Sequence, residues 1–587
     1  EIYNNATTRV LGDVYAEWEF LKDLKLKVSL GMDIMYLKQN KYTPSNIYQS
    51  LGIASAKVGV NRSINWLNEN ILTWNKTFKD IHSLNILGGF TIQRNNVESV
   101  TGASSNFVND VMKYNNLGAG SIYDKPESSA TQWSLMSYLA RINYSLYDRY
   151  LFSVNGRVDG SSRFGGNNKY GFFPSGSVAW RISEEGFMEP VKAVINNLKL
   201  RTSYGFTGNT EIGVYESLAT LGSNSWTIGN QLVSGFYPNR IPNPDLKWEK
   251  TGQFDIGFDL GLFNNRLRLT ADYYYKKTTD LLYNVAIPSA SGYDSMLKNI
   301  GSVQNKGYEL SIESDNLSGA FSWTTAFNIS FNRNKVLELG GETYKDVGTY
   351  DDHLKTSDIR RLIVGQPIGV FYGYRFDGIF QNEAECAQQT SSPSPIGVGL
   401  RRYKDLNGDG KIDATNDREI LGDANPKFFG GMTNTFAYKG FELNVFLQYS
   451  YGNKIFNYNA MELESPTGGQ NVYQDLVNRW TPTNPSNEYQ KATTNRNNIV
   501  SDRFIEDGSF LKLKTVSLSY SFPKLNWKHI GGLRLYVTGQ NLLTWTKYRG
   551  YDPEVSYRGA STLEAGEDFG GYPQARTFMF GIKLDIK

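Results

Sequence analysis

Apolar and polar residues alternate along most of the chain with a period of two. In the segment 24–36 the alternate positions are apolar, and most positions between them are polar: Leu24, Leu26, Val28, Leu30, Met32, Ile34 and Tyr36. The same pattern recurs at 136–146, 254–260, 441–449 and 578–586. Successive side chains of a β-strand point to opposite faces, so the alternation predicts strands with one apolar face and one mostly polar face.

The predicted strands are long. We find about seventeen alternating segments of ten or more residues, whereas strands of globular proteins average about five or six. A transmembrane barrel strand needs about 9–11 residues and one uninterrupted apolar face. A soluble propeller or tandem sandwich is the alternative, but those folds have shorter strands and an internal repeat, and no fixed-period repeat is present. The pattern therefore predicts an all-β fold, a transmembrane antiparallel β-barrel.

The connections between the predicted strands alternate between two classes. The short ones are 21–23, 79–80, 147–149, 263–265, 317–320 and 438–440, with 184–195 and 523–531 slightly longer. The long ones are about 43–62, 98–130, 208–247, 280–305, 337–426, 456–507 and 546–575. Outer-membrane barrels have short periplasmic turns and long extracellular loops, so we assign the two classes to those two sides.

This alternation fixes the direction of each strand. Segment 427–438 must run inward, so 337–426 is predicted to be one long extracellular loop. Within it, 368–380 looks like a strand, and we expect a hairpin or an extended arm because a full crossing would break the alternation. The first strand, about 8–20, also runs inward, so we expect an odd number of strands upstream. An odd number of strands leaves open edges in lipid, so residues 1–587 are interpreted as the C-terminal portion of a barrel, either a fragment or one chain of a split barrel.

Composition narrows the function classes. The chain carries 61 Lys and Arg against 58 Asp and Glu, which gives no basic surface for nucleic acid. Mean hydropathy is −0.44, and no apolar run is long enough for a membrane helix. The single cysteine, Cys386, excludes an internal disulfide framework, and the three histidines have no metal-binding spacing. No catalytic set of residues stands out, so we predict that the protein is not an enzyme.

One acidic loop has the spacing of a cation site. Oxygen-bearing residues at positions 1, 3, 5 and 9, a turn glycine at position 6 and a backbone carbonyl at position 7 match the Ca²⁺-binding loop pattern. The glutamate expected at position 12 is absent, and an aspartate lies one residue further on. We predict a structural Ca²⁺ or similar hard cation in the 405–417 loop, whereas the alternative is an Asx-rich turn without an ion. The predicted ligands are Asp405, Asn407, Asp409, Lys411 (through its carbonyl), Asp413 and Asp417.

Aromatic residues make up 14% of the chain, and many lie in the predicted long loops. Because aromatic faces stack on sugars and on peptide side chains, we predict that loop aromatics bind solute. Packing between loops or against a partner is the alternative for each of them, and aromatics at strand ends are assigned to interfacial girdles. The candidates are Trp226, Tyr237, Tyr283, Tyr293, Tyr344, Tyr350, Tyr372 and Tyr374.

Several blocks of sequence together carry a family resemblance. They include VDGSSRFGGNNKYGFFPSGSVAWRISEEGF (158–187), LKLRTSYGFTGN (198–209), NPDLKWEKTGQFDIGFDLGLFNNRL (243–267), VGQPIGVFYGYRFDGIFQ (364–381), 401–434, NRWTPTNPSN (478–487), RFIEDGSFLKLKTVSLSYSF (503–522) and LRLYVTGQNLLTWTKYRGYDPEVS (533–556). In sequence and in order, these blocks resemble the SusC/RagA class of TonB-dependent outer-membrane transporters of Bacteroidetes. The resemblance covers most of the chain from about residue 130.

The resemblance implies a barrel of about 22 strands, of which about seventeen are in this chain, and a plug domain that is absent from it. It also implies active import of an oligosaccharide or oligopeptide across the bacterial outer membrane, in contact with outer-membrane lipid. The implied partners are a SusD-like surface lipoprotein, the TonB complex, and the missing plug and N-terminal strands. Two other function classes stay open, a passive porin and a non-transporting surface scaffold or adhesin.

Overall fold

The computed structural model describes residues 1–293, 295–348, 359–465, 471–494, 498–523, 530–559 and 561–586. The candidate aromatic Tyr350 lies outside these residues. The chain divides into two compact units. Unit 1 contains residues 1–180, 201–253 and 278–300, and unit 2 contains residues 181–200, 254–277 and 301–587.

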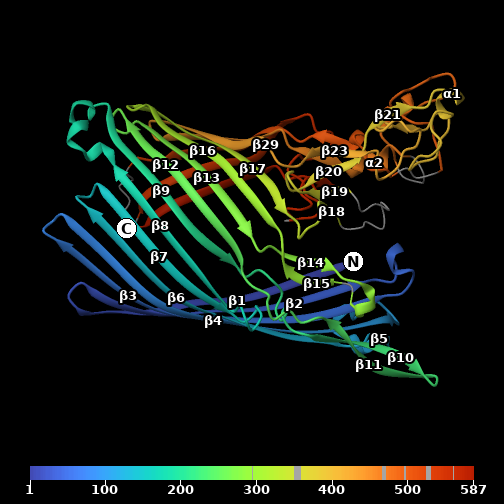
Figure 1. Cartoon of the computed structure of the whole chain (residues 1–587), viewed down its shortest axis with the longest axis horizontal. Helices are drawn as coiled ribbons and strands as arrows, with labels where there is room; N and C mark the ends of the chain where they lie inside the picture. Colours follow the sequence, from blue (N-terminus) through green and yellow to red (C-terminus); the bar gives the residue numbers. More distant parts are fainter. Residues whose placement is uncertain are drawn as a thin grey trace. The chain divides into compact units, whose positions relative to one another are not determined.

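Unit 1 is built on long strands, each paired antiparallel with the next in chain order (Figure 1). They are β1 (Ile2–Leu21), β2 (Leu24–Thr43), β3 (Ser55–Phe78), β4 (His82–Phe107), β6 (Glu127–Leu146), β7 (Tyr150–Ser161) and β8 (Tyr170–Arg181). The short strand β5 (Gly120–Tyr123) pairs with β4. The unit also contains two hairpins, β10 (Thr220–Ile228) with β11 (Gln231–Arg240), and β14 (Leu282–Ala286) with β15 (Ser295–Asn299).

Unit 2 repeats this arrangement with its own antiparallel series. Its long strands are β16 (Ser302–Leu317), β17 (Phe321–Glu338), β24 (Phe428–Tyr438), β25 (Phe441–Tyr451), β28 (Phe510–Ser521), β29 (Ile530–Thr546) and β31 (Thr577–Ile586). Three further long strands, β9 (Ile195–Asn209), β12 (Glu249–Leu262) and β13 (Leu267–Thr279), contribute residues to both units. Among the described residues, these bring the long strands of the antiparallel series to seventeen, in agreement with the about seventeen segments that the alternation predicts. Across the described ranges, no helix is both long and apolar enough to span a bilayer.

The shortest connections are tight turns. Lys79 and Asp80, between β3 and β4, both have a positive φ, of 53° and 54°. A two-residue turn with positive φ at both positions matches the right-handed twist of the flanking strands. The predicted short connection 79–80 is therefore a hairpin turn.

Two predicted loops are wrong in extent. Residues 43–62 and 98–130 are expected to be loops, but β3 begins at Ser55 and β4 continues to Phe107. The paired ends carry alternating polar and β-branched residues and an ion pair of 3.3 Å between Arg62 and Glu98. The strands continue beyond the part of the sheet that has an apolar face, because cross-strand pairs of polar and β-branched residues also stabilise β-pairing.

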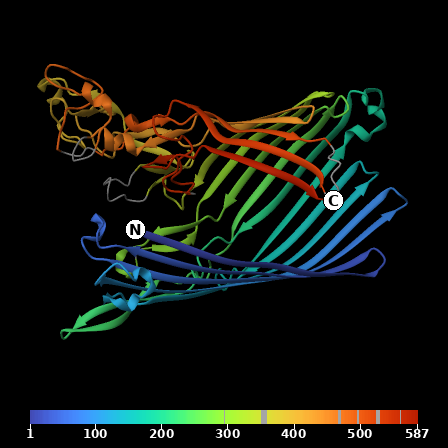
Figure 2. The same ribbon diagram turned by 180° about the vertical axis from the view of Figure 1, so that it is seen from behind.

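Unit 2 carries a compact assembly of small elements beyond one end of its long strands (Figures 1 and 2). We call the described residues of 339–427, 452–509 and 547–576 the loop assembly. Its elements are β18 (Tyr344–Val347), β19 (Arg360–Ile363), β20 (Val370–Tyr374), β21 (Phe376–Ile379), α1 (Glu383–Cys386), β22 (Arg401–Tyr403), β23 (Arg418–Asp423), β26 (Lys454–Asn457), α2 (Tyr458–Leu463), β27 (Ile505–Asp507) and β30 (Glu567–Asp568). Phe371, Phe456, Tyr458, Met461 and Phe504 form its buried core.

The segment 368–380 is neither a hairpin nor a free arm. Its first half, β20, pairs with β19 and β23, and its second half, β21, pairs with β22. The expectation fails because two of the three pairing partners, β22 and β23, lie tens of residues further along the sequence. The segment 339–427 connects β17 to β24, and these two strands pair directly along Phe321–Ser330.

The remaining helices are short 3₁₀ turns in the connections. In unit 1 they are Tyr48–Ser50, Lys113–Asn115, Leu117–Ala119 and Ser289–Ser291. In unit 2 they are Ile182–Glu184, Gly186–Val191, Gln474–Asn478 and Asp502–Phe504.

Candidate functional site

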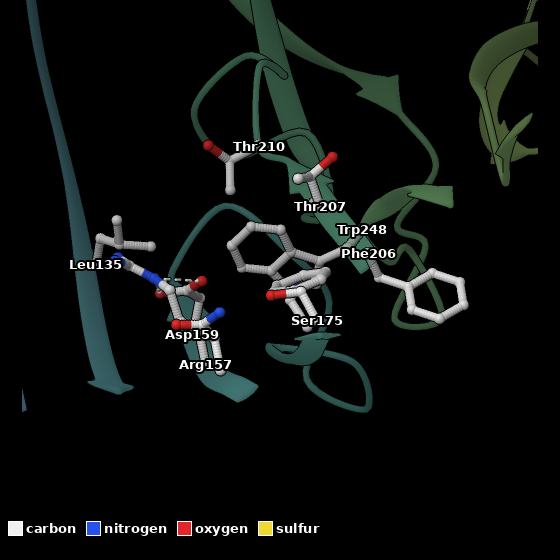
Figure 3. Close-up of a pocket in the computed structure, with 11 residues that line it drawn as sticks. Leu135, Arg157, Asp159, Ser175, Phe206, Thr207, Thr210 and Trp248 are labelled. Atoms are coloured by element: carbon white, nitrogen blue, oxygen red, sulfur yellow. Dashed lines mark hydrogen bonds and ion pairs between the residues drawn. The ribbon is translucent and has the colours of Figure 1, made fainter. Parts of the chain in front are cut away.

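Unit 1 contains a cavity of about 470 Å³ on the polar face of its sheet (Figure 3). Cross-strand register places Ser137 of β6 opposite Asp159 of β7, and Asn155 of β7 opposite Ser175 of β8. The alternate residues, including Val154 and Phe172, form the exposed apolar face. The cavity is lined by Leu135, Asn155, Arg157, Asp159, Phe173, Ser175, Phe206, Thr207, Gly208, Thr210 and Trp248.

The apolar part of the cavity is a packed aromatic cluster. The ring of Trp248 lies 4.9 Å from that of Phe164 and 5.3 Å from that of Phe173, between ring centroids. The indole Nε1 of Trp248 donates a hydrogen bond of 3.0 Å to the carbonyl of Lys169. Phe164, Phe173 and Trp248 are buried with Leu246 in one cluster, so the aromatic wall is fixed in place.

The polar part is organised by one ion pair. The guanidinium Nε of Arg157 donates to both carboxylate oxygens of Asp159, at 2.7 and 2.9 Å, and Nη2 donates to the hydroxyl of Ser137 at 3.0 Å. Asp159 is buried, whereas the Arg157 side chain is nearly half exposed. The pair therefore holds the exposed edge of the guanidinium against the cavity.

The two parts face each other. Figure 3 shows Leu135, Arg157 and Asp159 on one side of the cavity and Phe206 and Trp248 on the other. Flat apolar surfaces combined with a few placed polar groups are typical of ligand-binding pockets. The arrangement is suited to binding a ligand that has both apolar faces and polar groups.

Sequence reasoning missed this cavity. Seven of its eleven lining residues come from three of the sequence blocks that carry the family resemblance, 158–187, 198–209 and 243–267. Alternation alone could have placed Asn155, Arg157 and Asp159 on one face. What the alternation does not contain is the return of the chain that brings Trp248 onto Phe173.

The predicted solute-binding aromatics do not gather in this cavity. Trp226 and Tyr237 are exposed on the β10–β11 hairpin, and Tyr283 and Tyr293 are partly buried in and near the β14–β15 hairpin. None of the four lines the cavity of Figure 3. Their role in solute binding stays a prediction.

In the loop assembly the predicted aromatics make internal contacts. Tyr374 is buried, with its ring centroid 5.8 Å from that of Tyr403. The guanidinium of Arg361 lies 4.0 Å from the ring centroid of Tyr372, and that of Arg418 lies 5.1 Å from it. Arg361 also lies 3.9 Å from the ring centroid of Tyr344. These contacts favour the packing alternative for Tyr344, Tyr372 and Tyr374.

The 405–417 loop is held by carboxylates that accept backbone hydrogen bonds. Asp405 accepts from the amides of Gly408 and Gly410, both at 2.7 Å. The buried Asp417 accepts from the amides of Leu406 and Asp413, both at 2.8 Å. Each carboxylate thus closes a turn of the loop.

The other predicted ligands follow the same pattern. Asn407 and Asp409 accept from the amides two residues on, at 3.2 and 2.8 Å. The amides of Asn416 and Thr415, which donate to Asp413, lower the pKa of that carboxyl. Within the described residues no group of three or more His, Cys, Asp or Glu side chains is arranged to hold a metal. The Asx-turn alternative accounts for these contacts, and cation binding by this loop stays a prediction.

Long strands with one exposed apolar face, an opposite polar face and a cavity on that polar face define the class, a transmembrane β-barrel of the outer membrane. The chain belongs to the TonB-dependent receptor family: residues 3–449 match the model described as "TonB dependent receptor-like, beta-barrel". The predicted family, fold class and outer-membrane location are thereby confirmed.

Two curated relatives support this membership. The chain is 39% identical to TonB-dependent receptor P3 of Formosa agariphila over 97% of its own length and 57% of the relative. It is 30% identical to TonB-dependent receptor SusC of Bacteroides thetaiotaomicron over 98% of its own length and 55% of that protein. The chain therefore spans a little over half the length of these relatives, and both are named as receptors, not as enzymes.

Among solved structures, the chain is similar to one described as the structure of the RagAB peptide transporter. The TM-score is 0.85 at 26% identity, covering 99% of this chain and 62% of that one. The likeness extends through the long strands and the loop assembly.

Proposed function

We propose that the full-length protein imports a nutrient solute across the outer membrane in a TonB-dependent manner. The observation that carries this proposal is the similarity of nearly the whole chain both to SusC and to a chain of the RagAB peptide transporter. A barrel of about 22 strands encloses a lumen too wide for side chains to fill. A plug and energy coupling through TonB would therefore control transport.

The cavity of unit 1 supports contact with the solute on the polar face. It offers aromatic surface from Phe206 and Trp248 and hydrogen-bonding groups from Asn155, Ser175 and Arg157. A solute that has both flat apolar faces and many polar groups fits this combination. Oligosaccharides and oligopeptides share these properties, and both exceed the size that a general porin passes.

The loop assembly supports capture by a surface partner. Its apolar core of Phe371, Phe456, Tyr458 and Phe504 is fully buried, so its outer surface is held in one shape. A SusD-like lipoprotein needs such a fixed surface to close over. We propose this lipoprotein as the capping partner and the extracellular side as the location of the assembly.

Uptake by cells that produce the full-length protein tests the proposal. A deletion strain is supplied with labelled oligosaccharides and, separately, labelled oligopeptides. We expect loss of uptake of one of the two classes and recovery on complementation. Collapse of the proton-motive force should abolish the recovered uptake, and purification should recover a surface lipoprotein with the protein.

Other outcomes identify the alternatives. Uptake that continues after the proton-motive force collapses, together with ungated conductance in planar bilayers, indicates a passive porin. Unchanged uptake of both solute classes with altered attachment of cells indicates a scaffold or adhesin. Either result contradicts the import proposal.

A further inference from the structure

A second cavity lies at the ends of long strands of unit 2 and includes part of their apolar face. Its volume is about 580 Å³, and it is found where β24, β25, β28 and β29 end towards the loop assembly. Aromatic and aliphatic side chains make up most of the lining, and polar groups lie at one end. It is lined by Phe428, Tyr449, Ser450, Tyr451, Asp507, Ser509, Phe510, Leu511, Trp545, Thr546 and Lys547.

Strand register places five of the apolar lining residues on the face that contacts lipid, whereas Phe510 lies on the opposite face with Ser450 and Thr546. Phe428 lies opposite Tyr451, Tyr449 lies opposite Leu511, and Leu511 lies opposite Trp545. Directly opposed residues of neighbouring strands share one face, so these side chains form a row across four strands. Further along the same strands that face carries Phe436, Leu443, Leu518 and Val537. The cavity is thus the outer end of a continuous apolar surface.

The polar end of the cavity carries a cation. Lys547 is exposed and lies two residues beyond Trp545, just past the end of β29. Asp507 lies at the same end and accepts hydrogen bonds from the hydroxyl of Ser509 at 2.6 Å and from its amide at 3.1 Å. The carboxylate of Asp507 is thereby held by its own turn, and its charge is also opposed by Lys547.

A second cation, Arg333, lies beside the other end of the aromatic row. The ring of Phe331 on β17 lies 5.8 Å from that of Phe428, between centroids. Arg333 follows two residues later on the same face and is exposed, and its Nη1 donates to the carbonyl of Lys427 at 3.0 Å. Aromatic side chains at the membrane interface with cations just beyond them match the boundary between acyl chains and phosphate headgroups.

We propose that this cavity binds an anionic, acylated lipid of the outer leaflet. An acyl chain lies along Tyr449, Leu511 and Trp545, and the headgroup phosphate meets Lys547. The charge complementarity selects an anionic lipid over a zwitterionic one. The site is independent of the polar-face cavity, so it stands or falls separately from solute import.

Native mass spectrometry of the full-length protein in detergent tests the site. Diphosphoryl lipid A is the anionic probe and phosphatidylcholine is the zwitterionic comparison. We expect retention of lipid A at concentrations at which phosphatidylcholine is lost. Lys547→Glu should weaken lipid A binding at least about tenfold, and Trp545→Ala should weaken binding of both lipids, because one change removes the phosphate contact and the other removes apolar surface.

Lys38→Glu is the matched control. Lys38 is exposed and lies two residues beyond the exposed Tyr36 on β2, so it has the same interfacial setting but does not line the cavity. Its binding should equal that of the unsubstituted protein. Lys547→Gln serves if Lys547→Glu fails to fold. An equal loss in Lys38→Glu, equal retention of the two lipids, or displacement of lipid A by inorganic phosphate alone overturns the proposal.

Discussion

Arg360 and Glu567 lie 207 residues apart in the sequence and form an ion pair of 2.9 Å between Nε and Oε1. Both side chains are almost fully excluded from solvent, with exposures of 0% and 2%. Arg360 also donates to the carbonyls of Gly369 and Ala565, and its guanidinium lies 4.2 Å from the ring centroid of Phe371. The pair joins the chain before β24 to the chain after β29 within the loop assembly.

Glu567→Gln should loosen the loop assembly. The substitution keeps the shape of the side chain but leaves the Arg360 guanidinium buried without its counter-ion, which costs about 3–5 kcal/mol. Hydrogen exchange should rise in residues 359–371 and 561–568 and not in β24 or β25. Asp346→Asn is the control, because its ion-pair partner, Arg361, is the residue that follows Arg360, and the Asp346 side chain is partly exposed. That change should cost about 1 kcal/mol or less.

Lys512→Met should release the segment after β29. The ammonium of Lys512 is buried and lies 2.7 Å from Asp552 and 2.5 Å from Glu554. Without it both carboxylates lose their main partner, at a local cost of about 3–5 kcal/mol. Proteolysis within 547–559 should accelerate. Lys514→Met is the matched control, because Lys514 contacts one carboxylate, Glu554 at 3.2 Å, besides the amide oxygen of Gln574 at 2.9 Å, and is more exposed. Equal sensitivity of the two variants would contradict a latch at Lys512.

The long strands could be predicted from sequence because the apolar and the polar face of each strand are visible in its own alternating residues. In β25 the apolar residues Leu443, Val445 and Leu447 alternate with polar ones, and no distant contact is needed to see it. The tight turns at Lys79 and Asp80 follow from the same pattern. The barrel class and the approximate number of strands therefore come directly from periodicity.

The cavities and the loop assembly could not be predicted because they depend on non-local contacts. Phe206 and Trp248 line one cavity only because the connection between them folds back. Arg360 and Glu567 form an ion pair although most of the sequence of unit 2 lies between them. Tyr374 looks like a loop aromatic in the sequence, yet it is buried against Tyr403. Aromatic composition alone does not separate a binding surface from a small core.

The order of the 413–417 turn should depend on acidity. The amides of Asn416 and Thr415 lower the pKa of Asp413 below its ordinary value of 3.8. A lowered folded-state pKa means that the carboxylate supports the turn above pH 3.8 and that this support is lost as pH falls through the lower, folded-state value. Hydrogen exchange of residues 415–416, corrected for intrinsic pH dependence, should show this loss. In Asp413→Asn the dependence should disappear.

Substitution of Asp405 and Asp409 by Ala should loosen the 405–417 loop whether or not an ion binds. The amides of Gly408, Gly410 and Lys411 lose their carboxylate acceptors in either case. Addition of millimolar Ca²⁺ separates the two interpretations. If the loop holds a cation, Ca²⁺ protects it from proteolysis in the unsubstituted protein and a chelator reverses the effect. Protection that is identical with Ca²⁺ and with chelator leaves the Asx-turn interpretation.

Arg157→Gln and Phe206→Leu should reduce solute uptake more than Trp226→Ala does. The first two remove a polar contact and a flat face from the polar-face cavity, whereas Trp226 is exposed on the β10–β11 hairpin. Trp248 is a poorer target, because truncating a packed aromatic costs about 3–5 kcal/mol of stability and confounds the result. Both cavity variants should raise the concentration for half-maximal uptake about tenfold, which corresponds to about 1.4 kcal/mol of binding. Surface abundance of the protein, measured by labelling of intact cells, controls for folding. A larger loss in Trp226→Ala would instead assign solute capture to the hairpin.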